Sequence, residues 1–423
     1  MIEWIVIVLT VVGSGCLLGF PAVAAALLLI SSTLDGIVMP VPGGDSSVAH
    51  LGLLAAFPSL LIATISSRNQ FNATIQSSIV LLVFGATISS VFVILAPGVL
   101  VSFLKFIAYL AAFFCITTTI SQKNLNLWMY AAVSCILLSA ALSMLLTLYQ
   151  TTPVGIHLTG GFLDWNYYAV FLCVWIPIIW QMACVEQNPK RQQWFYVLAA
   201  VLCALVIGTR SKSGLLLLAL TLSSVFATGL APRRYLLWLI PVALFGGIIV
   251  MRGGNEGFVL TERLTAIVEQ PRMQERLSNW RLAFELFIQH PIVGLGVKQY
   301  EAYSSQWLND PLFLVSRSYS GFLVLLAECG ILAGLGYCAL FVYLISEAFG
   351  KFSAPNSSRA ILCALIVLSA SSLLTNIHDH LFTWCFLGWA AALLQSNQSG
   401  QPMGDVSAPC QSAVFPDTAS PSD

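Results

Sequence analysis

The stretch FLVLLAECGILAGLGYCALF, which runs from Phe322 to Phe341, decides the fold class. Glu328 is its one acidic residue, and it contains no lysine or arginine. An apolar run of roughly 20 residues is long enough to cross the hydrocarbon core of a bilayer as an α-helix, which makes all its backbone hydrogen bonds internally. The stretch therefore predicts a membrane-spanning helix.

The rest of the chain repeats this pattern. Hydrophobic residues make up 58% of the 423 residues, charged residues only 9%, and the mean hydropathy is +0.87. Soluble proteins carry about 25% charged residues, so this composition indicates a membrane protein. Together the apolar runs predict an all-α, polytopic membrane helix bundle of about 12 transmembrane helices with one large extracytoplasmic loop. After residue 38 the expected spans are Ala49–Ser66, Ser78–Ala96, Leu100–Ile120, Leu127–Tyr149, Tyr167–Val185, Trp194–Gly208, Gly214–Gly229, Tyr235–Val250, Ser320–Ser346, Ala360–Thr375 and Leu381–Leu394.

The predicted organisation has four parts. Residues 1–251 carry membrane helices (about 10 spans), residues 252–318 form the extracytoplasmic loop, residues 319–395 form the C-terminal membrane helices, and residues 396–423 form a cytoplasmic tail. The tail is rich in Ser, Pro, Gln and Asp and is expected to be disordered. The N-terminal apolar stretch continues past Cys16, so we expect no cleaved signal. It forms either two helices broken near Pro21 or one helix and a re-entrant piece.

The orientation follows from the basic residues, which collect in cytoplasmic loops. Alternation of the expected spans puts eight of the 18 Lys and Arg residues on one side, namely Arg68, Lys123, Lys190, Arg191, Arg233, Arg234, Lys351 and Arg359. The same alternation puts the loop 252–318 and the short segments around Arg210 and His378 on the outer side. The unusual polar chemistry is therefore expected at the outer face.

The loop contains a predicted amphipathic helix. In RMQERLSNWRLAFELFIQH, residues 272–290, apolar side chains recur at helical spacing and Pro291 stops the helix. We expect it to lie on the membrane surface or over the bundle. The apolar residues at that spacing are Leu277, Trp280, Phe284 and Phe287.

The segment IGTRSKSG, residues 207–214, joins two expected spans on the outer side. The positive-inside rule disfavours Arg210 and Lys212 there, so a functional role is plausible. Guanidinium groups match the oxygens of a diphosphate, and the neighbouring serine hydroxyls add donors. The alternative interpretation is a plain helix hairpin with an interfacial cation.

Four segments, in this order, resemble the O-antigen ligase/polymerase superfamily of bacterial polytopic glycan transferases. They are GGFLDWNYYAVFLCVWIPI (160–178), GTRSKSGLLLLAL (208–220), ERLSNWRLAFELFIQHPIVGLGVKQY (275–300) and FLVLLAECGILAGLGYCALF (322–341). The resemblance covers about residues 160–343, whereas the N-terminal third matches only in hydrophobicity.

The resemblance implies a membrane glycosyltransferase of the bacterial inner membrane that needs no metal or cofactor. Such proteins move an undecaprenyl-diphosphate-linked glycan, O-antigen or exopolysaccharide, onto lipid A-core (ligase) or onto another glycan (polymerase) at the extracytoplasmic face. By motif position Arg210 and Arg276 would hold the diphosphate, with Lys212 and Arg281 as further cations. A hinge of Pro291, Gly294 and Gly296 would close over the donor. Membrane lipids are expected partners, and nucleic acid is not.

The expected catalytic group departs from the family pattern. Many ligases carry a histidine about nine residues before the glutamate of the fourth segment, and here Tyr319 stands at that place. The segment TNIHDHLF offers a substitute, because the carboxylate of Asp379 lies between His378 and His380 and could accept a proton from the acceptor hydroxyl. Alternatively it is an ordinary polar turn at the membrane interface. A metal site there lacks a clear further ligand.

A transporter or flippase of a lipid-linked or small polar substrate is the alternative function. Transporters usually place ionisable residues near mid-membrane and often contain inverted repeats. This sequence shows no repeat, and only Lys105 and Glu328 look even partly intramembrane. Charge gathered at one aqueous face favours chemistry there.

Overall fold

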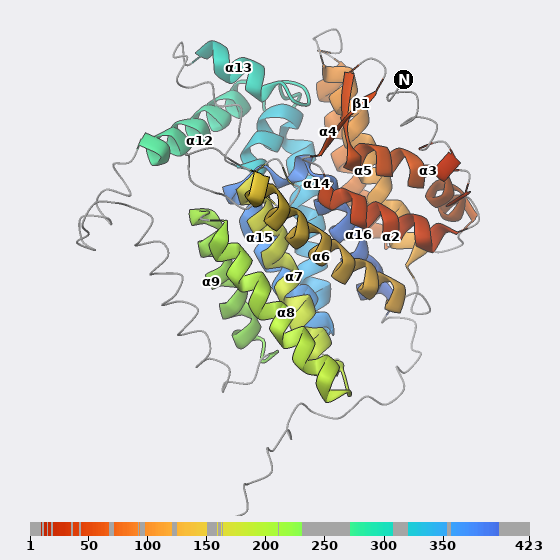
Figure 1. Ribbon diagram of the computed structural model, residues 1–423. Coiled ribbons are helices and arrows are strands. Elements are labelled where there is room, and N and C mark those ends of the chain that lie inside the picture. Colours follow the sequence, from red (N-terminus) through yellow and green to blue (C-terminus); the bar gives the residue numbers. More distant parts are fainter. Residues whose placement is uncertain are drawn as a thin grey trace, which may run out of the picture.

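The computed structural model is a bundle of helices (Figure 1). It describes residues 10, 12–14, 16–17, 20–34, 37–41, 44–66, 72–91, 93, 98–120, 125–149, 159, 162, 164–209, 211–230, 271–307, 320–352 and 357–396. The expected span Tyr235–Val250, both ends of the loop 252–318, Arg210, Tyr319 and nearly all of the tail lie outside the described residues.

The helical class predicted from the apolar runs is confirmed. The helices are α2 (Pro21–Ser31), η1 (Ser32–Leu34), α3 (Val48–Ser66), α4 (Ala73–Val91), α5 (Val99–Thr119), α6 (Leu125–Tyr149), α7 (Trp165–Val185), α8 (Pro189–Gly208), α9 (Lys212–Ala227), α12 (Pro271–Gln289), α13 (Tyr300–Trp307), α14 (Gly321–Gly350), α15 (Ser357–Leu374), η5 (Ile377–Asp379) and α16 (Leu381–Ser396). A short antiparallel hairpin of β1 (Val38–Val41) and β2 (Gly44–Ser47), which the sequence did not suggest, precedes α3.

Six of the described helices are long and apolar enough to cross a membrane. They are Val48–Ile65, Ala73–Val91, Val99–Thr119, Trp165–Val185, Pro189–Gly208 and Gly321–Gly350, and five shorter apolar helices accompany them. Apolar side chains on these helices face outward, as lipid-facing positions must; Ile65, Val80 and Phe84 are 76%, 64% and 54% exposed. The count of about 12 remains a prediction.

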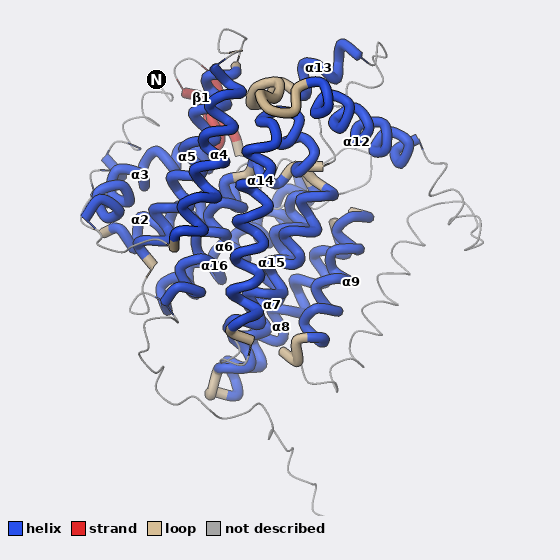
Figure 2. Tube along the Cα trace, turned by 180° about the vertical axis from the view of Figure 1, so that it is seen from behind, coloured by secondary structure: helices blue, strands red, loops and turns tan. Residues whose placement is uncertain are grey.

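The core forms where these helices pack against one another and against the shorter helices. The contacts join α14 to α4, α7 to both α8 and α15, and α16 to α5 (Figure 2). Aromatic side chains fill the contact between α7 and α16, where the Trp175 ring lies 5.8 Å from that of Phe386 and 5.7 Å from that of Trp389. Lipid is as apolar as these side chains, so the hydrophobic effect does not drive the helices together. Close van der Waals packing holds them together instead.

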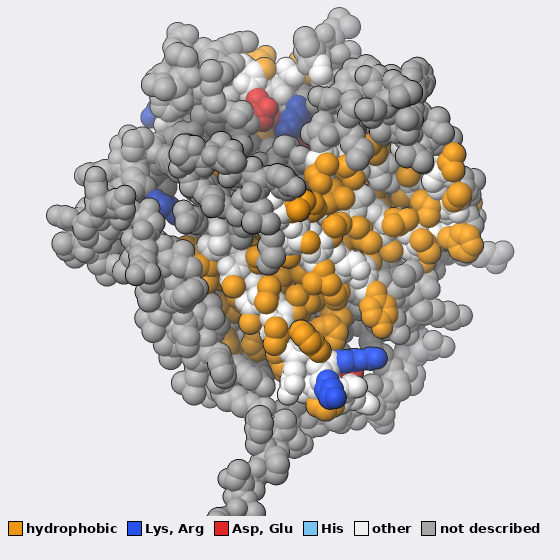
Figure 3. All heavy atoms as spheres, viewed as in Figure 1, with side chains coloured by type: hydrophobic (Ala, Val, Ile, Leu, Met, Phe, Trp, Pro, Cys, Tyr) orange, Lys and Arg blue, Asp and Glu red, His pale blue; other side chains and the backbone are white. Residues whose placement is uncertain are grey.

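The two ends of the bundle differ in character. Helices α12 and α13 lie across one end, and the joint between α7 and α8 lies at the other (Figure 1). The second end holds four of the basic residues expected to share one side, namely Lys190, Arg191, Lys351 and Arg359. Cys184 there contacts the Leu230 carbonyl at 3.5 Å, and Arg359 Nε donates to the Phe352 carbonyl at 3.1 Å. Apolar side chains cover the middle of the face drawn in Figure 3.

Helix α12 has two apolar faces. Leu282, Ala283 and Leu286 are buried in a small core with α14, whereas Leu277 and Phe284 are 48% and 52% exposed. The helix itself and its end before Pro291 agree with the sequence prediction. Of the expected apolar stripe, Phe287 packs against this core, whereas Leu277 and Phe284 face outward.

Candidate active site

The segment after α12 is a tight turn docked on α14. Gly294 and Gly296 have positive φ of 71° and 102°, and Lys298 has a φ of 63°. The Leu295 amide donates to the Ala327 carbonyl at 2.9 Å, and the Gly296 amide donates to the Glu328 carbonyl at 2.9 Å. We call residues 291–299 the docked turn. It is the segment in which the sequence predicted a glycine hinge.

The turn docks there because α14 is broken. Gly330 has a φ of 73° and a ψ of −177°, which no helix residue adopts. A broken helix leaves backbone groups without partners, and buried groups of this kind must be satisfied elsewhere. The turn supplies those partners, since the Ile331 amide also donates to the Pro291 carbonyl at 2.8 Å. The third and fourth family-like segments thus form one structural unit.

Glycine is required on both sides of this contact. A Cβ on Gly294 would lie 2.3 Å from the Glu328 carbonyl oxygen, and one on Gly330 would lie 2.3 Å from the Ile292 carbonyl oxygen. Ser89 of α4 completes the contact, because its hydroxyl donates to the Glu328 carbonyl and accepts from the Gly296 amide at 2.7 Å.

The buried Glu328 side chain fixes the start of α13. Its Oε1 accepts from the Tyr300 amide at 3.1 Å. The Tyr300 hydroxyl lies 3.0 Å from the Asn279 carbonyl oxygen of α12. Burial, and then the nearby Glu328 carboxylate, raise the pKa of Tyr300, so its hydroxyl stays a donor.

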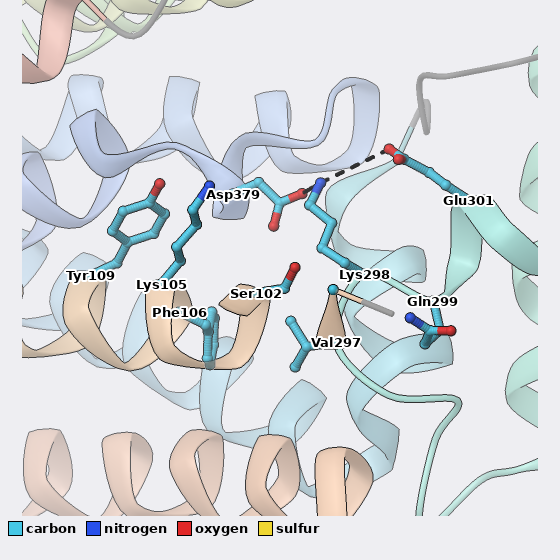
Figure 4. A pocket seen from close by; sticks show the side chains of 10 residues that line it. Ser102, Lys105, Phe106, Tyr109, Val297, Lys298, Gln299, Glu301 and Asp379 are labelled. Atoms are coloured by element: carbon cyan, nitrogen blue, oxygen red, sulfur yellow. Dashed lines mark ion pairs between the residues drawn. The ribbon is translucent and has the colours of Figure 1, made fainter. Parts of the chain in front are cut away.

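The docked turn brings Lys298 to η5. Its ammonium forms an ion pair with Asp379 and lies 3.9 Å from Glu301 Oε1 (Figure 4). Asn376 Nδ2 also donates to Asp379 Oδ2 at 2.7 Å. Burial alone would lower the pKa of Lys298 and raise that of Asp379. The attraction between the two charges outweighs burial, so the pKa of Lys298 is raised and the pKa of Asp379 is lowered.

The two histidines beside Asp379 are buried. His378 Nε2 lies 3.6 Å from Asp379 Oδ1, and burial lowers the pKa of His378, which favours the neutral ring. The His380 ring lies 3.9 Å from the Tyr167 ring of α7. Of the three residues predicted as catalytic in this segment, Asp379 lines a cavity between η5 and α5.

That cavity has a volume of about 290 Å³ and lies between α5, the docked turn and η5 (Figure 4). Its lining residues are Gly98, Ser102, Lys105, Phe106, Tyr109, Val297, Lys298, Gln299, Glu301 and Asp379. The Tyr109 hydroxyl is 2.7 Å from His50 Nε2, and His50 Nδ1 is 2.7 Å from the Ser47 hydroxyl. Burial raises the pKa of Glu301.

Sequence reasoning missed most of this cavity. It assigned no role to Lys298, Glu301, His50 or Tyr109. Lys298 and Asp379 stand far apart in sequence, and only the docking of the turn on α14 brings them together. The one available signal was a lysine, Lys105, inside an apolar run.

A second polar cluster joins the first two family-like segments. The hydroxyls of Ser211 and Ser213 donate to Asn166 Oδ1 at 2.6 Å and 3.0 Å. The Ser211 hydroxyl also accepts from the Gly214 amide at 2.9 Å and so begins α9. Arg210 belongs to this joint by sequence but lies outside the described residues. Because Tyr167 contacts His380, the cluster and η5 share one end of the bundle.

The other predicted phosphate-binding residues lie on the surface of this end or near it. Lys212, at the start of α9, is exposed, and Arg276, on α12, is half-buried. Arg281 is also on α12, with a side chain 82% exposed, and its Nε lies 2.8 Å from Glu285 Oε1. A solvent-exposed ion pair of this kind is weak, so Arg281 can leave Glu285 and bind another anion. In the described part of the chain, no group of three or more His, Cys, Asp and Glu side chains could hold a metal ion.

The comparison with known families agrees with the resemblance seen in the sequence. Residues 197–338, about one third of the chain, match the family model described as O-antigen ligase. No curated protein matches the chain. The matched part contains the α8–α9 joint, α12, the docked turn and the broken first half of α14. This match supports a membrane protein of the glycan-processing type, and it supports the resemblance of the chain to the O-antigen ligase/polymerase superfamily.

Proposed function

We propose that the protein transfers a glycan from undecaprenyl diphosphate to an acceptor at the extracytoplasmic face of the bacterial inner membrane. The acceptor is lipid A-core for a ligase or another glycan for a polymerase, and the glycan is O-antigen or exopolysaccharide. The observation that carries this proposal is the docked turn. It joins α12 to the break in α14 and sets Lys298 against Asp379 at the end of the bundle that also holds Ser211 and Asn166.

The leaving group is the polyprenyl diphosphate. Arg210 and Arg276 bind its oxygens, and Lys212 and Arg281 add positive charge. Guanidinium forks match phosphate oxygens in pairs, and hydroxyls such as that of Ser213 complete the donor set. Cations placed where negative charge develops stabilise the departure of the diphosphate, so the reaction requires no metal.

The acceptor hydroxyl attacks from the cavity. The bond between the anomeric carbon and the diphosphate oxygen breaks, the new glycosidic bond forms, and the hydroxyl proton passes to the Asp379 carboxylate. Because glycosyl transfer passes through an oxocarbenium-like transition state, the hydroxyl becomes acidic as it bonds, and a weakly basic carboxylate suffices. His378 and His380 hold the Asp379 segment, and Tyr319 orients the acceptor.

Deleting the gene and examining the surface glycan tests this proposal. A polymerase leaves single repeat units attached to the acceptor. A ligase leaves lipid-linked polymer and no glycan on lipid A-core. Intact surface glycan, or an intermediate trapped on the cytoplasmic side, would contradict the proposal; the second outcome is that of a flippase.

Complementation with point variants locates the chemistry. Arg276→Ala and Asp379→Asn should fail to restore the glycan although each protein reaches the membrane in normal amounts. Lys190→Ala, at the opposite end of the bundle, is the matched control and should restore it fully. Restoration by both Arg276→Ala and Asp379→Asn would remove this site from the mechanism.

A further inference from the structure

The two lysines at the cavity are paired unequally. Lys298 is paired with Asp379 and also lies near Glu301. Lys105 of α5 is exposed at the cavity, and its ammonium points toward the same space as Asp379 (Figure 4). Within the part of the chain that the structure describes, the Lys105 ammonium makes no ion pair and no hydrogen bond. It is a cation that an anionic ligand group could pair with.

The other lining groups are those that recognise a sugar. Carboxylates and the amide of Gln299 accept hydrogen bonds from sugar hydroxyls, and the hydroxyls of Ser102 and Tyr109 both donate and accept. Tyr109 is held in place by His50, so its hydroxyl is fixed before any ligand arrives. A cavity of about 290 Å³ is at the small end of ligand sites, which suits a single ring.

We propose that this cavity binds one anionic sugar of the acceptor glycan and that Lys105 pairs with the carboxylate or phosphate of that sugar. The inference rests on the proposed transfer reaction and adds the chemical class of its acceptor. Asp379 faces the attacking hydroxyl, and Lys105 faces the anionic substituent of the same ring.

A lipid phosphate explains the lining less well than a sugar does. Asp379 and Glu301 both face the cavity, and a phosphodiester that offers no hydrogen-bond donors would be repelled by them. A sugar ring brings hydroxyl donors to these carboxylates and an anion to Lys105. Lys105 and Tyr109 lie on α5, outside the matched residues 197–338. The cation that selects the acceptor therefore comes from the N-terminal helices, whereas the docked turn of the matched domain lines another side of the same cavity.

Transfer kinetics with three acceptors test the inference. The purified protein in nanodiscs receives one donor and oligosaccharide acceptors that end in a neutral hexose, a hexuronic acid or a hexose phosphate. Lys105→Met keeps the length of the side chain and removes its charge. We expect KM for at least one acidic acceptor to rise about tenfold, because a hydrogen bond to a charged group is worth about that factor. KM for the neutral acceptor and for the donor should stay within about twofold.

Two matched variants complete the test. Lys105→Arg should retain most of the preference for the acidic acceptor, and Lys190→Met, at the far end of the bundle, should change none of the three constants. An equal loss with neutral and acidic acceptors would overturn the inference, because Lys105 would then only support the fold. So would an unchanged preference in Lys105→Met.

Two further measurements separate binding of a lipid headgroup from binding of a sugar, and binding from transfer. Nanodiscs of phosphatidylcholine alone and with phosphatidylglycerol distinguish a sugar anion from a headgroup; an effect of Lys105→Met seen only with the anionic lipid would overturn the inference. Saturation-transfer NMR with the methyl glycoside of glucuronic acid or a hexose phosphate measures binding without transfer. If binding requires Lys105 but the protein transfers nothing, the proposed reaction is refuted, whereas the binding of an anionic sugar in the cavity is supported.

Discussion

At the scale of single residues, two glycines decide whether the candidate site forms. Gly294 and Gly330 each have a positive φ. The Glu328 carbonyl occupies the space that a Cβ on Gly294 would need, and the Ile292 carbonyl occupies the space that a Cβ on Gly330 would need. The family resemblance implied that Pro291, Gly294 and Gly296 form a hinge that closes over the donor, and the closing motion remains a prediction. The sequence could not show that Gly330 is the partner, because that glycine stands in an apolar run that is typical of an unbroken helix.

Gly294→Ala should therefore undock the turn. A non-glycine residue at positive φ costs about 1–2 kcal/mol, and the clash with the Glu328 carbonyl adds to this cost. We expect a lower melting temperature in detergent and loss of transfer, since Lys298 leaves Asp379. Gly350→Ala is the control, because a Cβ there meets nothing within 4 Å. Equal stability of the two variants would contradict the docked turn.

The ion pair of Lys298 and Asp379 belongs to the same scale. Lys298→Met should cost about 1–2 kcal/mol, less than a fully buried pair, because the Lys298 side chain is 36% exposed and solvent screens it. In a double-mutant cycle with Asp379→Asn, the double variant should lose little more than either single variant. Additive losses would show that the two side chains do not interact.

The pH dependence of stability follows from the direction of each shift. The raised pKa of Lys298 and the lowered pKa of Asp379 make the pair stabilising between about pH 4 and pH 10, and the contribution is lost outside that window. The pKa of His378 is lowered, so the unfolded chain binds the proton more readily and stability falls as the pH drops below about 6.5.

His378→Gln should flatten this acid loss. The melting temperature of the wild type should fall between pH 7.5 and 5.5 by more than that of His378→Gln. His290→Gln, a change in an exposed histidine, should keep the wild-type slope. The same slope in all three proteins would mean that His378 is not responsible.

At the scale of elements, α12 shows what an apolar pattern leaves open. Its sequence predicts an amphipathic helix that ends before Pro291, and the structure has that helix. Two apolar stripes run along it, however, and the pattern does not tell which one packs on protein. Leu282, Ala283 and Leu286 pack on α14, and Phe284 and Ile288, 52% and 58% exposed, face away. Only tertiary contact with α14 decides between the two stripes.

The exposed stripe predicts contact with lipid. In a cysteine-free background, a spin label at position 284 should relax faster with oxygen, which concentrates in the bilayer, than with a water-soluble nickel complex. A label at position 281, on the exposed side that carries the pair with Glu285, should show the reverse. Water accessibility at both positions would place α12 away from the membrane.

At the scale of the whole molecule, the helical class predicted from the sequence is confirmed, whereas the outer placement of the polar chemistry remains a prediction. Apolar length predicts helices because the bilayer leaves few alternatives. The cavity could not be predicted, since it needs Lys105, Lys298 and Asp379 from three distant segments. The described part of the loop 252–318 is tied by hydrogen bonds to α14, and its role as an extracytoplasmic unit remains a prediction.

One claim underlies the whole account: cationic side chains at the end of the bundle that carries the docked turn hold a polyprenyl diphosphate while its glycan leaves. The most direct measurement is single-turnover transfer by the purified protein from a labelled undecaprenyl-diphosphate glycan, with release of the diphosphate followed in the same sample. We expect transfer without added metal, a loss of about a thousandfold or more in Arg210→Ala and in Arg276→Ala, and full activity in Lys190→Ala. Wild-type rates in both arginine variants would contradict it.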